Sequence, residues 1–299
     1  MPIGQIVKAI SGFYYVRTDD GKLFKCRARG VFKFEKRKLT PLVGDLVEME
    51  QTGLDEGVVT SVQPRSSELI RPPIANVDQA VVVCSLRQPR FQQMPLDRFL
   101  VHSEREGLKI VIVLTKKDLV KDRAEEEIGR IRAVYQPAGY PVIATSIKTQ
   151  EGIGELKQCL KGKVSVFAGQ SGVGKSSLLN RLLPDRELET GKVSAKIGRG
   201  RHTTRQVELL PLPEGGQVAD TPGFSQLQFK GMEAVELGQY FPEIRERSAG
   251  CRFRGCLHIN EPDCAVKSAL EQGAIDGSRY RHYTQFLSEI KEAMVRRYT

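Results

Sequence analysis

A glycine-rich stretch in the middle of the chain, GQSGVGKSS at residues 169–177, constrains the fold more than any other feature. It fits G-x-x-x-x-G-K-[ST], a pattern in which the backbone N–H groups of a strand-to-helix loop surround the phosphates of a nucleotide. The flanks agree, because the apolar run 164–168 is typical of a buried strand and the leucine-rich run 178–183 of a helix. We therefore expect a nucleoside triphosphate site. Lys175 would contact the β- and γ-phosphates, and the Ser176 hydroxyl would bind Mg²⁺.

Strand and helix patterns alternate along the chain before this loop. Apolar runs at 77–86, 109–114 and 141–145 have the composition of buried strands, and helical patterns at 96–106 and 124–135 separate them. Such alternation predicts an α/β fold with a parallel sheet and helices on both of its faces.

The strand at 109–114 is followed by Thr-Lys-Lys-Asp at 115–118, which fits the [NT]-K-x-D element that reads guanine in GTPases. A carboxylate at Asp118 can accept hydrogen bonds from both the N1–H and the exocyclic amine of guanine, a donor pair that adenine lacks. The aliphatic stem of Lys116 would lie along the base. Thr-Ser-Ile-Lys at 145–148 resembles the second base-contacting loop, with Ser146 as the contact residue.

Two further segments after the phosphate loop have the pattern of nucleotide-sensing switches. Gly-Arg-Gly-Arg-His-Thr-Thr-Arg at 198–205 is glycine-rich and basic, and Thr203 or Thr204 would supply a second hydroxyl to Mg²⁺. Asp-Thr-Pro-Gly at 220–223 is a D-x-x-G element, in which Asp220 would hold Mg²⁺ through water and the Gly223 N–H would meet the γ-phosphate.

The order of these motifs indicates a circular permutation. GTPases usually run from phosphate loop through the switches to the base-reading loops, whereas here both base-reading elements come first. A permutation keeps the packed sheet and moves only the chain ends, and surface loops tolerate this. Phe224 stands where many GTPases carry the glutamine that orients the attacking water, so we expect slow intrinsic hydrolysis. His202 is the candidate catalytic substitute, with RNA contact or loop capping as alternatives.

The first 68 residues have an all-β pattern. Short strands are expected within 7–17, 22–28, 45–50 and 57–63, which favours a small barrel of the OB type. The segment 27–38 is basic and carries Phe32 and Phe34, so it is a candidate RNA-binding segment. The alternative is a solvated loop whose phenylalanines turn into the barrel. The candidate RNA contacts are Arg27, Arg29, Lys33, Lys36, Arg37 and Lys38.

The charge and the cysteines narrow the cellular setting. Lys and Arg exceed Asp and Glu by ten (46 minus 36), which suggests a polyanionic partner such as nucleic acid. The longest apolar runs are too short to span a membrane. Three of the six cysteines are isolated and three cluster near the C-terminus, without a secretory segment, which favours a metal site in a reducing compartment. We therefore expect a cytoplasmic protein.

The clustered cysteines form the spacing C-x4-C-x-H-x5-C. Three thiolates and one imidazole, from Cys251, Cys256, His258 and Cys264, complete a closed tetrahedral zinc shell with no open position for chemistry. The zinc should be structural, because the segment around it has few apolar residues with which to build a core. Arg252 and Arg254, within the same loop, are further candidate RNA contacts. A terminal helix is expected over about 277–297.

Together, the barrel, the motifs TKKD, GQSGVGKSS, GRGRHTTR and DTPGF in permuted order, and the cysteine–histidine loop resemble the RsgA family, also called YjeQ or YloQ. The likeness covers essentially the whole chain. It implies a GTPase stimulated by the small ribosomal subunit and acting late in that subunit's maturation, with rRNA binding, one structural zinc, Mg²⁺ bound with GTP, and a cytoplasmic monomer. Thr115 departs from the asparagine that many members carry, and its shorter side chain would weaken hydrogen bonds between loops.

The resulting expectation is an OB-fold RNA-binding domain at 1–68, a permuted GTPase domain at 69–228 and a mainly helical zinc-binding domain at 229–299. The alternatives are a zinc-stabilised RNA-binding nucleotide switch and a free-standing NTPase with no ribosomal role. The expected GTP contacts are Thr115, Lys116, Lys117, Asp118, Ser146, Gly169, Gln170, Ser171, Gly172, Val173, Gly174, Lys175, Ser176, Ser177, Asp220 and Gly223. The expected Mg²⁺ ligands are Ser176, Thr204 and Asp220.

Overall fold

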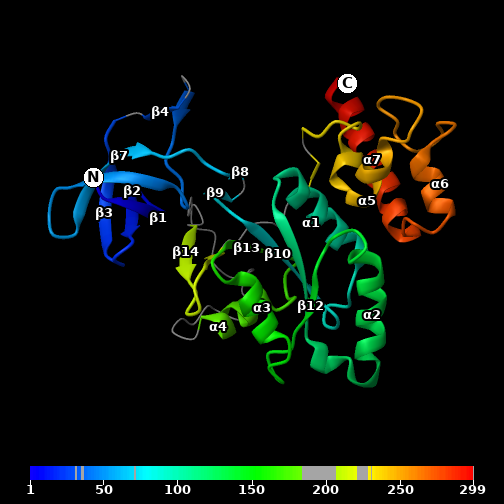
Figure 1. Ribbon diagram of the computed structural model, residues 1–299, viewed down its shortest axis with the longest axis horizontal. Helices are drawn as coiled ribbons and strands as arrows, with labels where there is room; N and C mark the ends of the chain where they lie inside the picture. The colour runs from blue at the N-terminus through cyan, green and yellow to red at the C-terminus, as the bar shows by residue number, and fades with distance from the viewer. Residues whose placement is uncertain are drawn as a thin grey trace. The chain divides into compact units, whose positions relative to one another are not determined.

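The computed structural model describes residues 1–30, 32–34, 37–70, 72–183, 207–220, 228–229 and 231–298. The described residues form two compact units (Figure 1). The first comprises 1–81, 154–168 and 175–225, and the second comprises 82–153, 169–174 and 226–299. Both units draw on the predicted GTPase domain, so the bounds of the three predicted domains stay a prediction.

The N-terminal strands of the first unit form a closed five-stranded barrel. Its strands are β1 (Ile3–Ile10), β2 (Phe13–Thr18), β3 (Leu23–Ala28), β6 (Leu46–Gln51) and β7 (Glu56–Val62). They pair in the order β1-β2-β3-β7-β6, and a further β1–β6 pairing closes the barrel. Only the β3–β7 pair is parallel. The predicted small barrel is therefore confirmed.

Alternation along each barrel strand builds the barrel's core. Ile6, Val16, Cys26, Met49 and Val59 are each fully buried, one from each strand. Their sequence neighbours on β2 and β3 are half-buried or exposed, as the period-two geometry of a strand requires. The single strand expected within 7–17 is instead two strands. Ser11 and Gly12 interrupt it with positive φ angles of 48° and 81°, which is the two-residue hairpin turn that suits twisted strands.

Two short hairpins accompany the barrel. The first pairs β4 (Phe32–Phe34) with β5 (Arg37–Leu39), within the basic segment. The second pairs β8 (Glu68–Ile70) with β9 (Pro73–Ala75), in the stretch where prolines and serines break the barrel pattern. Arg65, ahead of that second hairpin, donates two hydrogen bonds of 2.7 Å to the fully buried Asp45 carboxylate. The stretch is thus fastened to the barrel by a bidentate ion pair.

The remaining strands of the first unit hold the phosphate-loop strand in place. β13 (Val164–Ala168) pairs in parallel with β15 (Gln217–Asp220), which pairs antiparallel with β14 (Glu208–Pro211). β14 meets β1 of the barrel at Lys8 and Glu208, whose side chains form a 3.0 Å ion pair. Helices α3 (Ile153–Leu160) and α4 (Lys175–Leu182) precede and follow β13 in the chain.

The second unit contains the sheet edge that carries the base-reading loops. β10 (Gln79–Ser85), β11 (Lys109–Thr115) and β12 (Val142–Ala144) lie in the order β12-β11-β10, and β11 pairs in parallel with β12. Helices α1 (Gln93–Arg105) and α2 (Ala124–Tyr135) connect them, so the predicted α/β alternation is confirmed. No described helix is both long and apolar enough to cross a membrane.

The C-terminal part of the second unit has an apolar core of its own. It contains α5 (Pro242–Ser248), α6 (Ala265–Glu271) and α7 (Gly277–Tyr298) (Figure 1). Apolar side chains from these helices take part in one buried cluster. The aromatic members of that cluster are Phe229, Phe241, Tyr283 and Phe286. The cluster draws mostly on residues outside the ligand segment 251–264, for which few core residues were expected. The apolar residues of this region are spread over sixty positions and meet only when α5 and α7 pack.

A buried ionic group joins α7 to α1 and α5. Arg279, 1% exposed, donates to Asp97 at 2.8 Å and to Glu243 at 2.7 and 3.1 Å. The Tyr135 hydroxyl also donates to Asp97, at 2.8 Å. Burial opposes the charge on the guanidinium, but the two carboxylates prevail and hold the pKa of Arg279 well above its usual value. The arginine satisfies carboxylates from two other helices, so it fixes α1, α5 and α7 to one another.

Arg279→Met is expected to destabilise the chain by about 3–5 kcal/mol, because it removes the buried cation of Glu243 and leaves Asp97 with only Tyr135 and His282 as partners. Urea unfolding followed by circular dichroism would measure the loss. Arg281→Met on the same helix is the matched control, because Arg281 is exposed, and it should shift the midpoint little. Equal midpoints for both variants would contradict the role of Arg279.

Candidate nucleotide and zinc sites

The phosphate loop approaches β10 so closely that a side chain cannot fit at its first glycine. A Cβ at Gly169 would lie 2.2 Å from the Val83 carbonyl oxygen, and the Gly169 φ is +143°. Helix α4 begins at Lys175, directly after the loop, so Lys175 and Ser176 belong to its first turn. The unsatisfied N–H groups of such a turn favour an anion. The loop can therefore receive phosphate where the motif predicts.

Hydrogen bonds tie the base-reading element to the phosphate loop. The Thr115 hydroxyl contacts the Val173 carbonyl oxygen, and the Lys116 ammonium donates to the Gly172 carbonyl oxygen at 2.8 Å. Lys116 adopts a left-handed backbone conformation with φ of 60°, and its ammonium also donates to the Gln88 carbonyl oxygen. Two motifs more than fifty residues apart thus share one site. The Thr115 hydroxyl thus reaches the loop, and its expected weakness relative to an asparagine stays a prediction.

The two predicted base-contacting side chains touch each other. The Ser146 hydroxyl donates to Asp118 Oδ1 at 2.7 Å. Asp118 lies in the short 3-10 helix η1 (Lys117–Leu119) after β11, and Ser146 follows the neighbouring strand β12. Ser146 also donates its N–H to the Glu151 carbonyl oxygen. Asp118 is half-buried, so its second carboxylate oxygen can meet the donor edge of a guanine.

Lys117, a predicted GTP contact, is turned toward acidic side chains. Its ammonium lies 2.8 Å from Glu125 and 2.7 Å from Glu151. Hydrogen bonds to Glu125 and then to Glu151 raise the pKa of Lys117. Because Glu151 also holds Ser146 through the backbone, Lys117 braces the loop that carries Ser146.

The expected Mg²⁺ ligands are only partly within the described residues. Ser176 is the second residue of α4, and Asp220 ends β15. Val166 of β13 is paired with Ala219, so the phosphate loop and Asp220 leave the same edge of two parallel strands. Thr204, Gly223 and the candidate catalytic His202 lie outside the described residues, as does Phe224.

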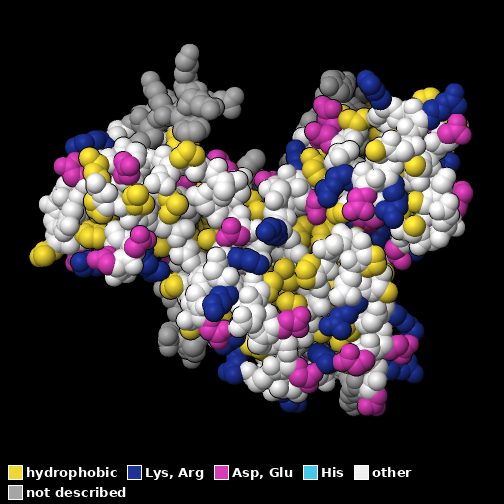
Figure 2. Space-filling model, viewed as in Figure 1, with side chains coloured by type: hydrophobic (Ala, Val, Ile, Leu, Met, Phe, Trp, Pro, Cys, Tyr) yellow, Lys and Arg dark blue, Asp and Glu magenta, His cyan; other side chains and the backbone are white. Residues whose placement is uncertain are grey.

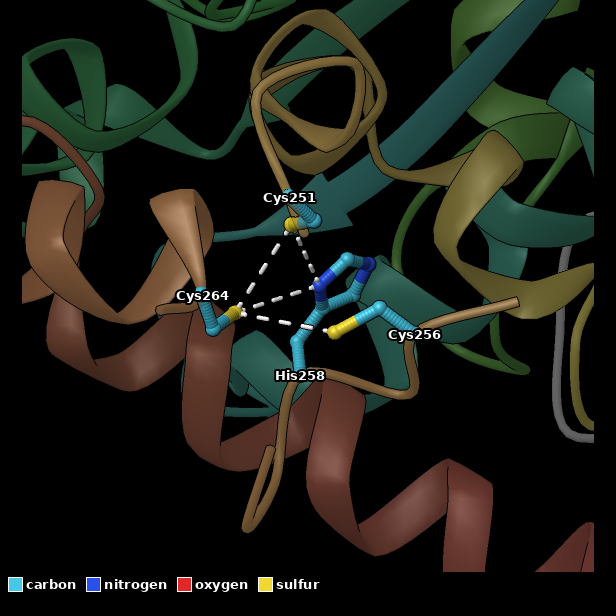
Figure 3. A group of neighbouring side chains, drawn as sticks. All are labelled: Cys251, Cys256, His258 and Cys264. Carbon is cyan, nitrogen blue, oxygen red and sulfur yellow. Dashed lines mark hydrogen bonds between the residues drawn. The ribbon is translucent and has the colours of Figure 1, made fainter. Parts of the chain in front are cut away.

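The four predicted zinc ligands converge in space (Figure 3). The Cys264 sulfur lies 3.9 Å from that of Cys251 and 3.8 Å from that of Cys256. His258 Nδ1 lies 3.5 Å from the Cys251 sulfur and 3.4 Å from the Cys264 sulfur. A tetrahedral zinc with bonds of about 2.3 Å to sulfur and about 2.0 Å to nitrogen needs S···S spacings of roughly 3.8 Å and S···N spacings of roughly 3.5 Å. The four distances above match these spacings, and all four ligand atoms lie within 4.8 Å of one another.

Neighbouring groups orient the ligands. Ser248 donates its hydroxyl proton to the Ile244 carbonyl oxygen, so its oxygen can accept from His258 Nε2–H at 3.4 Å, which leaves Nδ1 unprotonated for a metal. Glu261 accepts from the N–H groups of Leu257 and Ile259 at 2.8 Å, and from that of Asn260 at 3.1 Å. Burial opposes ionisation of Glu261, but these donors together lower its pKa to about 2. Sequence reasoning missed Ser248 and Glu261, because neither belongs to the ligand pattern.

The predicted RNA contacts differ in their exposure and in the side chains that they already contact. Arg29 pairs with Glu50 at 3.1 Å and Arg252 pairs with Asp263 at 2.9 Å, both pairs being largely exposed. Arg254 is exposed, and Arg27 lies over the Phe13 ring. The side chains of Lys33, Lys36, Arg37 and Lys38 lie outside the described residues.

Comparison with known proteins identifies the family of the chain. A model of the RsgA GTPase matches residues 62–230, more than half of the chain, and a model of the RsgA N-terminal domain matches residues 3–59. The chain belongs to the RsgA GTPase family. It is therefore a GTPase of that family, and the resemblance drawn from its motifs is confirmed.

Relatives and solved structures support this membership over the full length. The chain is 53% identical over 292 residues to a protein of Shouchella clausii named small ribosomal subunit biogenesis GTPase RsgA, covering 98% of each chain. It is 50% identical over 296 residues to the protein of that name from Bacillus subtilis, again covering 98% of each. A crystal structure of YloQ, described as a circularly permuted GTPase, matches with a TM-score of 0.83 and 46% identity, over 98% of this chain and 96% of that one. YjeQ from Thermotoga maritima matches with a TM-score of 0.84 and 36% identity, over 97% and 98%. The permuted fold is thereby confirmed.

Proposed function

We propose that this RsgA-family GTPase binds rRNA of the small ribosomal subunit and assists a late step of that subunit's maturation, hydrolysing GTP to GDP and phosphate. The observation that carries the proposal is the likeness, at 50–53% identity over nearly the whole chain, to relatives named for that role. The geometry supports guanine as the base, because Asp118 and Ser146 form one hydrogen-bonded pair beside loops joined by Lys116. We propose that the protein acts in the cytoplasm as a monomer.

The nucleotide would be held by the residues of four motifs. Asp118 and Ser146 bind guanine, the loop from Gly169 to Gly174 surrounds the phosphates, and Lys175 neutralises their charge. Ser176, Thr204 and Asp220 would hold Mg²⁺, which spreads the charge of the phosphates when bound. Ser177 and Gly223 are further expected contacts.

The switch step would be driven by docking. GTP-bound switches at 198–205 and 220–225 would hold the barrel and the zinc region in a ribosome-binding arrangement. Docking on rRNA would place His202 or an external group beside the attacking water, because Phe224 cannot orient it. Hydrolysis would release the switches and then the protein.

The distribution of charge does not by itself identify the RNA-binding surface. On the face shown in Figure 2, basic and acidic side chains are interspersed, although the chain carries ten more basic than acidic residues. The segment 252–254, between the first two zinc ligands, is one candidate contact. The Phe253 ring is exposed, and the Arg252 guanidinium lies 5.5 Å from its centre, with Arg254 next in the chain. Arg27 and Arg29 of the barrel are others.

Single-turnover GTP hydrolysis with and without purified small subunits tests the proposal. We expect subunits to raise the rate on the order of 10²-fold or more, because groups that complete GTPase sites contribute about 10³–10⁵ elsewhere. An unstimulated rate would favour a free-standing NTPase. His202→Ala should lose most of the stimulation if His202 orients the water, and equal stimulation of both proteins would remove it from that role.

A further inference from the structure

The outer face of β2 and β3 carries aromatic and basic side chains in neighbouring positions. Val16 and Phe24 point into the barrel core, whereas the alternating positions on the two strands point outward. The register pairs Tyr15 with Lys25 and Arg17 with Leu23 across the two strands. We call the set Phe13, Tyr15, Arg17, Lys25 and Arg27 the β2–β3 face.

Two of its cations lie over an aromatic ring. The Lys25 ammonium is 4.3 Å and the Arg27 guanidinium carbon 4.8 Å from the centre of the Phe13 ring. Lys25 and Arg27 are exposed and Phe13 is half-buried, so the group is open to solvent. An aromatic ring bordered by two cations matches a nucleotide, whose base can stack while its phosphates meet the charges.

These cations are not neutralised by carboxylates. Within the described residues, Arg17, Lys25 and Arg27 form no ion pair, whereas the nearby Lys8, Lys22 and Arg29 pair with Glu208, Asp20 and Glu50. Glu56 is the acidic residue that the register places beside Lys25. The face therefore carries an excess of positive charge, which favours a polyanion.

We propose that the β2–β3 face binds unpaired RNA bases, with Phe13 and Tyr15 as stacking surfaces and Arg17, Lys25 and Arg27 contacting the flanking phosphates. The inference rests on the proposed RNA-binding function and assigns it to residues that sequence reasoning did not select, Arg27 excepted. Stacking needs an exposed base, so single-stranded RNA should bind better than a duplex of the same length. Little sequence preference is expected, because every base offers a flat face.

Fluorescence anisotropy with the full-length protein tests the assignment. The probes are labelled oligoadenylate and oligouridylate of roughly 12 nucleotides, within the span of an OB barrel, and an RNA duplex of equal length. Phe13→Leu keeps the apolar bulk and removes the ring, so it should weaken single-strand binding by about 10-fold or more. Phe13→Tyr should retain binding, because it keeps the ring.

The charges are tested by a matched pair of lysines. Lys25→Gln and Lys22→Gln change the net charge equally, but Lys22 lies in the β2–β3 turn and pairs with Asp20. Lys25→Gln should weaken single-strand binding several-fold more than Lys22→Gln, and should flatten the dependence of log affinity on log salt by roughly 0.7. Thermal unfolding of each variant checks that the barrel is intact.

The outcomes separate this inference from the proposed function. If the wild type binds single strands and Phe13→Leu and Lys25→Gln bind them equally well, the assignment is wrong while RNA binding stands. If these variants keep their RNA affinity but lose affinity for small subunits, the face contacts a ribosomal protein, and the assignment is also overturned. If the wild type binds neither single strands nor subunits, the proposed function itself fails.

Discussion

Cys264→Ser is expected to abolish tight zinc binding and to unfold the loop between α5 and α6. Cys264 is 4% exposed. Its sulfur lies within 3.9 Å of the ligand atoms of Cys251, Cys256 and His258, so it is close to all three other ligands. A serine hydroxyl stays protonated at neutral pH and does not replace a thiolate as a zinc ligand. Structural zinc contributes about 10–16 kcal/mol to the folding of isolated zinc-finger peptides, so the expected loss is large.

The loss should be local, because the C-terminal region has a second source of stability. The segment 249–264 contains no helix or strand among the described elements, and the ligands and Glu261 organise it. Helix α7 instead packs through Tyr283, Phe286 and Leu287 and is tied down by Arg279. We therefore expect α7 to stay folded when zinc is lost.

Metal analysis and hydrogen exchange would measure both effects. The wild type should hold one zinc per chain and Cys264→Ser almost none. Amide protection should fall throughout 249–264 and in α6, and persist in α7. Cys159→Ser is the matched control, because Cys159 lies on α3 outside the cluster, and its zinc content should be unchanged. Full zinc content in Cys264→Ser would contradict the assignment, and loss of protection in α7 would show that zinc supports the whole region.

Most helices and strands could be predicted from local sequence patterns. The phosphate loop, the two base-reading elements and the zinc ligands are short motifs whose chemistry depends on residue types at fixed spacing, so the sequence is sufficient to find them. The α2 prediction of 124–135 has the bounds found in the structure, because three glutamates open that helix and its apolar residues keep helical spacing. The turn at Ser11 and Gly12 was missed because the apolar pattern continues across it.

Long-range contacts were not predictable in the same way. Asp97 and Arg279 are 182 positions apart, and each alone has the pattern of a solvent-exposed helical charge. Which residues pack together in the C-terminal core was also not predictable, because its members are scattered from Val101 to Ile290. The Phe13 ring under Lys25 and Arg27 depends on which residues face outward across two strands, a fact that needs the register. The sequence therefore predicts the helices and strands better than it predicts which distant residues contact one another.

Asp118→Asn is expected to change the nucleotide preference from guanine to xanthine. In the wild type, one Asp118 oxygen accepts from Ser146 at 2.7 Å, and the carboxylate can accept from two guanine donors. An asparagine amide presents one donor and one acceptor, so it opposes the guanine amine and suits the xanthine carbonyl. Sites that hydrogen-bond a substrate group reject analogues by about 10⁴–10⁵-fold, so we expect GDP affinity to fall by a factor on the order of 10³ or more.

Competition of GDP and xanthosine diphosphate against a fluorescent nucleotide would measure the change for Asp118→Asn. The matched control is Asp122→Asn, four residues along on an exposed turn, which removes the same charge and should leave both affinities unchanged. Lys116 joins this element to the phosphate loop through the Gly172 carbonyl oxygen, and Asp118→Asn leaves that contact in place. The substitution should therefore alter base choice while the hold on the phosphates remains, so xanthosine diphosphate should bind Asp118→Asn nearly as tightly as GDP binds the wild type. Loss of affinity for both nucleotides would mean that Asp118 supports the loops instead of reading the base, and an unchanged preference for GDP would remove it from the site.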